Sequence, residues 1–265
     1  MNKKYAICYN TSIENVTEAS LKLQNILNRH NLAFEVLNIN NLKPNFDFVF
    51  VIGGDGTILK ASRFYSKYQT PIFGVNLGHL GFLSQANLND VDYVIKKIIN
   101  KDYKIEERIM LECDNYTALN DFVIKGEENS RATNFALEIN GKFVSEYFAD
   151  GIIISTPTGS TAYGMASGGP VLTPDTQAIA IVPICPHTFA ARPLVISSES
   201  TIKIISKPEF KYCVSADGQE VFSFENELKI TKSKYNANLV LLNDNDFYSV
   251  LRNKLHWGFT PYKKV

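Results

Sequence analysis

Several features that mark special classes of protein are scarce in this chain. Only 4 of its 265 residues are cysteine and none forms a CxxC pair, so we expect reduced thiols rather than a disulfide framework. Basic and acidic residues number 27 each, so the positive excess typical of nucleic-acid binding is missing. No apolar run approaches the roughly 20 residues that span a bilayer, and the N-terminal residues lack the features of a signal peptide. We therefore expect a cytoplasmic protein with no nucleic-acid and no membrane partner.

Familiar catalytic and metal-binding motifs are also missing. The sequence contains no GxxxxGK[ST] loop, no HExxH or EF-hand pattern and no GxSxG elbow, which argues against the enzyme classes that depend on them. Its 4 histidines lie far apart without ligand spacing, so we expect no metal site made by the protein alone. The spacing of Gly74, Gly78 and Gly81 does not match the GxGxxG turn of ordinary dehydrogenases.

The composition is that of a folded globular protein. Hydrophobic residues make up 45% of the chain and charged residues 20%, close to the globular averages of about 45–50% and about 25%. At roughly 100–200 residues per domain, the length allows one large domain or two ordinary ones.

Residues 1–105 alternate strand-like and helix-like patterns, which predicts an α/β domain with a parallel sheet. The segment Phe48–Ile52 is apolar at every position, as expected for a central strand covered by helices on both faces. Apolar residues within 89–100 recur at helical spacing and predict a one-sided helix. Further strands are expected at 5–9, 34–39 and 71–75.

From about residue 106 the pattern changes to short strand-like segments separated by turn residues. The dipeptide Asn140-Gly141 joins two such segments, 135–139 and 142–148, and is a strong signal for a β-hairpin. Other strands are expected at 151–155, 178–184, 194–197, 201–205, 212–216 and 239–242. The second half of the chain is therefore predicted to be rich in β-structure.

The segment Gly53-Gly54-Asp55-Gly56-Thr57 follows the predicted central strand and precedes a helical pattern. Glycines let backbone amides approach a bulky anion, and such amides together with a helix N-terminus form a phosphate site. A carboxylate beside phosphates is unfavourable unless it accepts a proton or holds a magnesium ion. The alternative is a tight strand-to-helix turn without a ligand. We favour phosphate binding.

A second segment, residues 150–164, ends a predicted strand in a loop rich in hydroxyl groups. Hydroxyls and amides at a strand end suit ribose and phosphate oxygens, and Tyr163 could stack on a flat ring. The alternative is a Ser/Thr loop that caps a short helix. The residues alone leave these two interpretations open. The pairs Asn120-Asp121 and Asp217-Gly218 are most often turn corners.

Taken together and in order, these motifs resemble those of the bacterial NAD kinases: GGDGT at 53–57, NLGHLGFL at 76–83, ALND at 118–121, DGIIISTPTGSTAY at 150–163, GGP at 168–170 and DGQ at 217–219. The resemblance implies an N-terminal Rossmann-like (phosphofructokinase-like) α/β domain over 1–105. It implies a C-terminal β-rich, sandwich-like NAD-binding domain over 106–240, and a segment over 241–265 that returns to the first domain. It also implies a homo-oligomer, a dimer or a tetramer.

The resemblance further implies transfer of the terminal phosphoryl group of ATP, with Mg²⁺ or another divalent cation, to the 2′-hydroxyl of the adenosine ribose of NAD. Asp55 would be the catalytic base. An aspartate is too weak a base to remove the proton of a sugar hydroxyl in the ground state, so it would orient the hydroxyl and accept its proton late. The phosphates of ATP would be held by four neighbours of Asp55, namely Gly53, Gly54, Gly56 and Thr57.

The positions implied for NAD binding lie in the second half of the chain: Asn120, Asp121, Asp150, Thr161, Ala162, Tyr163, Ala166 and Gln219. Two of the motif positions differ from many relatives. Ala166-Ser167 stands where many relatives have Ser-Ala, so a polar contact at 166 is not expected. Phe148 stands where many carry an arginine associated with discrimination between NAD and NADH, so acceptance of NADH stays open.

Two other functions compete with this interpretation. A lipid kinase could use the same glycine-aspartate loop, but Asp121, Asp150 and the Ser/Thr-rich loop would line an acyl pocket poorly. A catalytically silent NAD-sensing module would keep the pocket without turnover, and the retention of Asp55 argues against it. The preference for ATP over another triphosphate or polyphosphate stays open.

Overall fold

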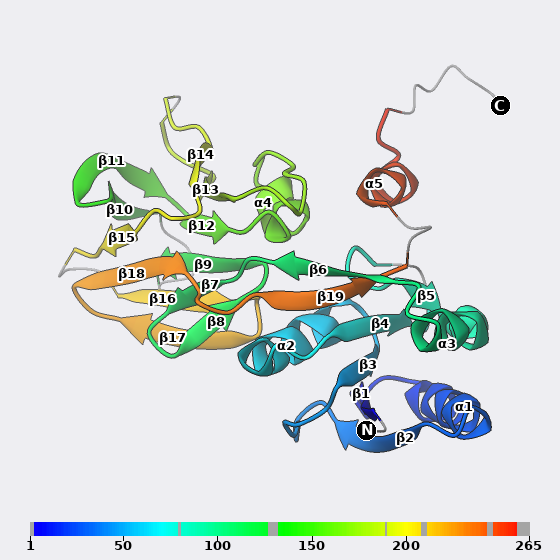
Figure 1. Cartoon of the computed structure of the whole chain (residues 1–265). Helices are drawn as coiled ribbons and strands as arrows, with labels where there is room; N and C mark the ends of the chain where they lie inside the picture. The colour runs from blue at the N-terminus through cyan, green and yellow to red at the C-terminus, as the bar shows by residue number, and fades with distance from the viewer. Residues whose placement is uncertain are drawn as a thin grey trace. The chain divides into compact units, whose positions relative to one another are not determined.

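The structure, a computed structural model, describes residues 3–78, 81–126, 132–188, 190–207, 211–242 and 246–258. The chain forms two compact units, Met1–Glu106 with Asn238–Val265, and Glu107–Ala237 (Figure 1). The C-terminal part of the chain therefore rejoins the first unit from Asn238 onward. His79 and Leu80 of the NLGHLGFL segment lie outside the described residues, as do parts of the C-terminal segment.

The first unit is built on a parallel sheet. In the described residues its strand order is β2-β1-β3-β4-β19-β6, with β5 paired to β4. The pairs β1/β2, β1/β3, β3/β4, β4/β5 and β4/β19 all run parallel. The strands are β1 (Lys4–Tyr9), β2 (Ala33–Asn38), β3 (Phe48–Ile52), β4 (Ile72–Asn76), β5 (Ala86–Asn87), β6 (Lys104–Arg108) and β19 (Ala237–Leu241).

Every residue of β3 and β4 is buried, which confirms the central strand predicted at Phe48–Ile52. A strand covered on both faces has a continuous apolar sequence, because the side chains on both of its faces are shielded from water. One core cluster joins aromatic residues of β3, such as Phe48 and Phe50, to apolar residues of two helices.

Helices cover the sheet of the first unit. The helical segments are α1 (Val16–Arg29), α2 (Asp55–Tyr65), η1 (Ser66–Tyr68), η2 (Leu88–Asp90), α3 (Val91–Ile99) and α5 (Phe247–Leu255). Helices α1 and α3 lie side by side (Figure 1), with Arg29 Nη2 at 3.2 Å from Asp92 Oδ1. Helix α2 packs against β3 and β4. The helix predicted within 89–100 is confirmed as α3.

Helix α5 was not expected from the sequence. Its N-cap residue Asp246 accepts a hydrogen bond from the amide of Ser249 at 2.9 Å, which satisfies one of the unpaired donors of the first turn. Near its end, the Lys254 ammonium lies 4.9 Å from the centre of the Phe82 ring. Within the described ranges, no helix is both long enough and apolar enough to cross a membrane.

The second unit consists of two antiparallel sheets. In the described part of the chain their orders are β11-β10-β15-β18-β7-β8 and β14-β13-β12-β9-β16-β17. The strands are β7 (Leu111–Cys113), β8 (Tyr116–Ala118), β9 (Asp121–Gly126), β10 (Thr133–Ile139), β11 (Lys142–Ala149), β12 (Gly151–Ser155), β13 (Ala178–Ile184), β14 (Leu194–Ser197), β15 (Ile202–Ile205), β16 (Tyr212–Ala216), β17 (Glu220–Phe224) and β18 (Glu227–Lys232). The helical segments η3 (Gly159–Thr161) and α4 (Tyr163–Ala166) follow β12.

The two sheets share one core. Phe135 of β10 and Ile204 of β15 belong to the same buried cluster as Phe122 of β9 and Ile152 of β12. The other face of the second sheet carries a smaller cluster that includes Ile153. Strands β12 and β13 are consequently buried at every position, and the resulting continuous apolar runs explain why their bounds match the prediction.

The hairpin predicted at Asn140-Gly141 joins β10 to β11. Asn140 has φ 53° and Gly141 has φ 74°, the pair of left-handed conformations that a two-residue hairpin turn requires. The register of the two strands shifts between Leu137 and Glu138. The conformations of Asn140 and Gly141 therefore determine where the chain turns between β10 and β11.

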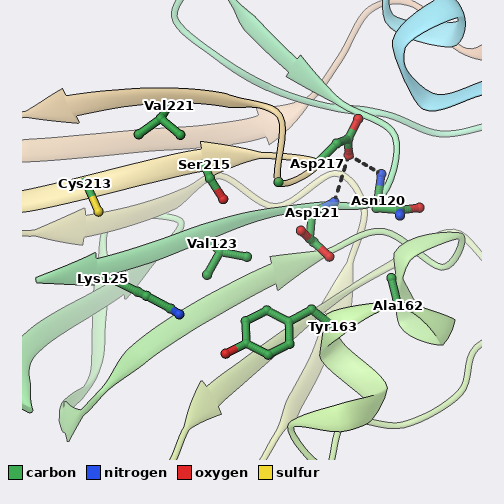
Figure 2. Close-up of a pocket in the computed structure, with 11 residues that line it drawn as sticks. Asn120, Asp121, Val123, Lys125, Ala162, Tyr163, Cys213, Ser215, Asp217 and Val221 are labelled. Carbon is green, nitrogen blue, oxygen red and sulfur yellow. Dashed lines mark hydrogen bonds between the residues drawn. The ribbon is translucent and has the colours of Figure 1, made fainter. Parts of the chain in front are cut away.

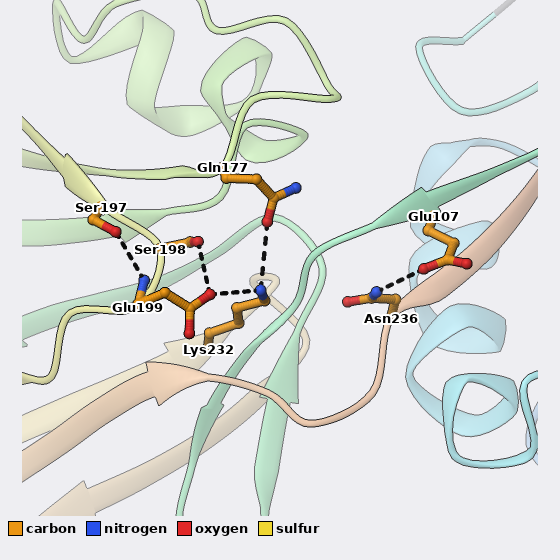
Figure 3. A network of polar contacts seen from close by, with 7 residues as sticks. All are labelled: Glu107, Gln177, Ser197, Ser198, Glu199, Lys232 and Asn236. Atoms are coloured by element: carbon orange, nitrogen blue, oxygen red, sulfur yellow. Dashed lines mark hydrogen bonds and ion pairs between the residues drawn. The ribbon is translucent and has the colours of Figure 1, made fainter.

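A polar network ties β18 to two loops of the second unit (Figure 3). The Lys232 ammonium lies 2.8 Å from Glu199 Oε1 and 3.4 Å from Gln177 Oε1. The hydrogen bond from Lys232 holds the pKa of the Glu199 carboxyl below its usual range. Asn236 Nδ2 donates to Glu107 Oε2 at 3.0 Å. These contacts connect segments that are distant in the sequence.

Candidate active site

The glycine turn predicted to hold phosphate lies between β3 and α2. Gly53 has φ 153°, and a Cβ atom there would lie 2.5 Å from Thr57 Oγ1, so glycine is required. Gly54 and Gly56 are exposed, and Thr57 is half-buried. A Cβ atom on Gly54 would meet nothing within 4 Å. The turn therefore leaves open space over its backbone at the N-terminus of α2.

Asp55 is the first residue of α2 and is half-buried. Its Oδ2 accepts a hydrogen bond from the Phe82 amide at 3.0 Å, and its Oδ1 accepts one from the Leu83 amide at 3.2 Å. The helix N-terminus and these two amides all favour a negative charge at this position. Sequence reasoning did not anticipate that residues 82 and 83 hold the carboxylate.

The strand order of the first unit supports the prediction of a ligand site at this turn. The chain places β2 on one side of β1 and β3 on the other, so the direction of winding changes between β1 and β3. In open parallel sheets, ligands bind beyond the carboxyl ends of the strands at such a switch point. Asp55 follows the carboxyl end of β3.

The second unit contains a cavity of about 400 Å³, within the usual size range of small-molecule sites, about 300–1,000 Å³. Four residues predicted for NAD binding line it: Asn120, Asp121, Ala162 and Tyr163. Figure 2 shows these side chains with the other lining residues. The lining that sequence reasoning did not assign consists of Val123, Lys125, Cys213, Ser215, Asp217, Gly218 and Val221.

Asp217 fixes the backbone of the Asn120-Asp121 pair. Its carboxylate accepts hydrogen bonds from the amides of Asn120 at 2.7 Å and Asp121 at 3.3 Å (Figure 2). It also accepts one from the amide of Leu119 at 3.1 Å. Asp217 and Gly218 have φ 51° and 64° and form the corner between β16 and β17. The hairpin corner was expected, but the Asp-Gly signal does not reveal that the same side chain anchors another strand.

Asp121 is 4% exposed. Burial, and secondarily the charge of Asp217, raise the pKa of the Asp121 carboxyl to about 7. Burial disfavours the charged form, and a second carboxylate nearby acts in the same direction. Near neutral pH the Asp121 side chain can therefore donate or accept a hydrogen bond toward a ligand.

The hydroxyl-rich loop after β12 uses several hydroxyls to hold its own backbone. Thr156 Oγ1 donates to the Leu119 carbonyl at 2.5 Å, and Ser160 Oγ donates to the Pro157 carbonyl at 2.6 Å. Arg108 donates to Thr158 Oγ1 at 3.2 Å. These contacts favour the structural interpretation for these hydroxyls. The loop fixes the start of α4 and thereby the position of Tyr163.

Tyr163 stands at one wall of the cavity. Its side chain is 38% exposed, and the Lys125 ammonium lies 5.4 Å from the ring centre. Aromatic rings stack on planar groups, and a cation over the ring face is favourable. The cavity therefore combines a planar surface, a cation and two carboxyl groups.

Four predicted NAD contacts lie outside the cavity lining. Asp150 is exposed, with Oδ1 at 3.9 Å from His187 Nε2. Thr161 donates to the Thr158 carbonyl at 3.2 Å. Ala166 is exposed at the end of α4, and Gln219 is exposed after the hairpin corner. Thr161 and Gln219 directly adjoin the lining residues Ala162 and Gly218 in the sequence.

Among the described residues, no group of three or more His, Cys, Asp or Glu side chains could hold a metal ion. The four cysteines are free thiols.

Comparison with known proteins covers both units. The family model for the ATP-NAD kinase N-terminal domain matches residues 4–103, and that for the ATP-NAD kinase C-terminal domain matches residues 119–242. The NAD kinase of Clostridium botulinum (strain Kyoto / Type A2) is 41% identical over 221 residues, which is 80% of this chain and 79% of the relative.

Solved structures show the same fold. The crystal structure of an NAD kinase from Archaeoglobus fulgidus in complex with ATP has a TM-score of 0.81 and 30% identity, and the match covers 96% of this chain and 98% of that chain. Yeast NADH kinase complexed with NADH has a TM-score of 0.86 at 24% identity, covering 99% of this chain and 90% of the other, and shows the fold alone. The resemblance seen in the motifs is thereby confirmed: this chain belongs to the ATP-NAD kinase family.

Proposed function

We propose that this chain transfers the terminal phosphoryl group of ATP to the 2′-hydroxyl of the adenosine ribose of NAD, giving NADP. The observation that carries this proposal is the position of Asp55. Its carboxylate lies at the N-terminus of α2, beside an open glycine turn and at the switch point of a parallel sheet. The order of the strands β2-β1-β3-β4 also supports the finer proposal of a Rossmann-like first domain.

The glycine turn would hold the phosphates of ATP. The exposed backbone at Gly54 and Gly56 and the N-terminus of α2 present amide groups and the positive end of the helix dipole, which suit a phosphate. Gly53 and Thr57 are proposed as further phosphate contacts on the strength of the motif resemblance, and Thr57 leaves no room for a Cβ atom on Gly53. A divalent cation would arrive on the ATP phosphates, where it neutralises charge.

Asp55 would orient the acceptor hydroxyl and accept its proton. Each carboxylate oxygen has more than one acceptor site, so one amide on each oxygen leaves room for a hydroxyl of the substrate. In the loose transition state of phosphoryl transfer most of the rate comes from positioning, and the proton moves as the new bond forms.

The cavity of the second unit would bind NAD. Asp121 and Asn120 offer groups that hydrogen-bond to ribose hydroxyls or a base edge, and the Tyr163 ring can pack against a planar ring. Ala162 lines the same cavity. Asp150, Thr161, Ala166 and Gln219 are proposed as further NAD contacts on the strength of the motif resemblance.

We propose in addition a homo-oligomer, a dimer or a tetramer, located in the cytoplasm. The four free thiols suit a reducing compartment, and the even balance of 27 basic and 27 acidic residues supports the proposal that nucleic acid is not a partner.

The proposed function is tested by measuring NADP formation from ATP, Mg²⁺ and NAD by the wild type, Asp55→Asn and Asp90→Asn. We expect Asp55→Asn to bind NAD but lose about 10²-fold or more in kcat, as for loss of a general base. Asp90 is an exposed aspartate of the same unit, and its variant should retain turnover. Near wild-type kcat in Asp55→Asn would remove Asp55 from the mechanism. If the wild type binds NAD but forms no NADP from it, the chain is a catalytically silent NAD-binding module.

A further inference from the structure

The turn Gly81–Leu83 wraps around the carboxylate of Asp55. The amide of Phe82 donates to Oδ2 at 3.0 Å and the amide of Leu83 donates to Oδ1 at 3.2 Å. Both oxygens are therefore held, which fixes the rotation of the carboxylate plane as well as its position. Successive amides around one anion form a small concave anion site.

Hydrogen bonds fix the segment Gly81–Leu83 to the end of β4. The Gly81 amide donates to Ser84 Oγ at 2.6 Å, and Asn76 Nδ2 donates to the same hydroxyl oxygen at 3.2 Å. Ser84 is 1% exposed and Asn76 is 9% exposed, so these hydrogen bonds form largely away from water. Three consecutive amides, at 81, 82 and 83, thus each have an acceptor of their own.

Because Gly81 has no side chain, the carboxylate of Asp55 can occupy the space where a Cβ atom would lie. A Cβ atom on Gly81 would lie 1.9 Å from Asp55 Oδ1 and 2.6 Å from Asp55 Cγ, so any side chain would displace Asp55 or the turn. The requirement is steric. Gly78 is a neighbouring glycine whose Cβ atom would meet nothing within 4 Å.

We propose that Gly81 is a positioning residue for phosphoryl transfer: by lacking a side chain, it allows the amides of Phe82 and Leu83 to hold Asp55 in the orientation that receives the acceptor hydroxyl. This inference rests on the proposed role of Asp55. Groups that react must be held close to their productive geometry, and a shift of about 1 Å can lower a rate about 10²-fold. Gly81 acts through Asp55 and does not itself touch the substrate.

The matched pair Gly81→Ala and Gly78→Ala tests the inference, with kcat and KM for NAD and ATP measured for both. We expect Gly81→Ala to lower kcat by about 10²-fold with KM changed by less than about 3-fold, because displacement of Asp55 affects the transition state more than binding. Gly78→Ala should keep wild-type kinetics. Equal kinetics of the two variants would overturn the inference.

The same substitution in the Asp55→Asn background separates positioning from a general structural effect. If Gly81 acts through Asp55, Gly81→Ala should change the residual kcat of Asp55→Asn by less than about 2-fold, since residues acting as a unit are not additive. A loss equal to that seen in the wild-type background would contradict the inference. An active Asp55→Asn variant would instead contradict the proposed role of Asp55, so the two failures are distinguishable.

Should Gly81→Ala fail to fold, Ser84→Ala takes its place, because it removes the acceptor of the Gly81 amide without adding atoms. We expect Ser84→Ala to lower kcat by about 10-fold with little change in KM, as the turn loses its support. An unchanged kcat in a folded Ser84→Ala protein would overturn the inference as well.

Discussion

The buried carboxyl of Asp121 makes the stability of the second unit depend on pH. Its pKa is raised from 3.8 to about 7, first by burial and then by the charge of Asp217. A folded-state pKa above the unfolded value means that the folded protein holds the proton more tightly. The contribution to stability is therefore fully present below about pH 4 and is lost as the pH rises through about 7.

The magnitude follows from the two pKa values. Each pH unit between them is worth about 1.4 kcal/mol, so the full loss is about 4 kcal/mol, and about 2–3 kcal/mol of it falls between about pH 5 and about pH 8. Asp121→Asn replaces the carboxyl with a neutral group of the same shape. The free energy of unfolding of the wild type minus that of Asp121→Asn should therefore fall by about 2–3 kcal/mol over this range.

The assay is urea unfolding of both proteins at a series of pH values. Comparison at each pH cancels the other titrating groups, which are common to both proteins. In an Asp217→Asn background the dependence should be shallower, because one of the two causes of the raised pKa is removed. A difference between wild type and Asp121→Asn that stays constant within about 0.5 kcal/mol across the range would refute the reasoning.

Two further substitutions test the anchoring contacts of each unit. Asp217→Ala leaves the amides of Leu119, Asn120 and Asp121 without their acceptor, so we expect a loss of about 1–3 kcal/mol in unfolding free energy. Its KM for NAD should rise more than its kcat falls, and an unchanged KM would show that Asp217 does not shape the NAD site. Gly53→Ala combines φ 153° with a Cβ atom 2.5 Å from Thr57 Oγ1, so we expect about 1–3 kcal/mol of destabilisation. Gly54→Ala, with nothing within 4 Å of its Cβ atom, should unfold at the urea concentration of the wild type.

Much of the fold could be predicted because it depends on local pattern. The strands at Phe48–Ile52, Gly151–Ser155 and Ala178–Ile184 are buried at every position and read as continuous apolar runs. The Asn140-Gly141 hairpin was set by two residues. By contrast, Tyr116–Ala118 is too short to give a pattern, and Glu220–Phe224 is largely exposed on a sheet edge. For α5 a signal did exist, because Asp246 is a suitable N-cap.

The site was predictable where it consists of one segment and not where distant segments meet. The GGDGT turn is a single strand-turn-helix unit, so its conformation between β3 and α2 could be inferred from the order of its residues, and its binding of phosphate stays a proposal. The contact of Asp55 with the amides at 82 and 83 depends on how the chain after β4 folds back. Likewise, Asp217 reaches the Asn120-Asp121 backbone only because β16 pairs with β9. No local pattern contains that information.

The most direct test of the central claim follows the phosphoryl group itself. ATP with a radioactively labelled terminal phosphoryl group would be incubated with the protein, Mg²⁺ and NAD, and the labelled product separated and its phosphate position determined by nuclear magnetic resonance. We predict that the label appears on the 2′-oxygen of the adenosine ribose, in NADP, and that Asp55→Asn forms this product about 10²-fold more slowly or worse. Label recovered as inorganic phosphate, or at any other position of NAD, would contradict the account.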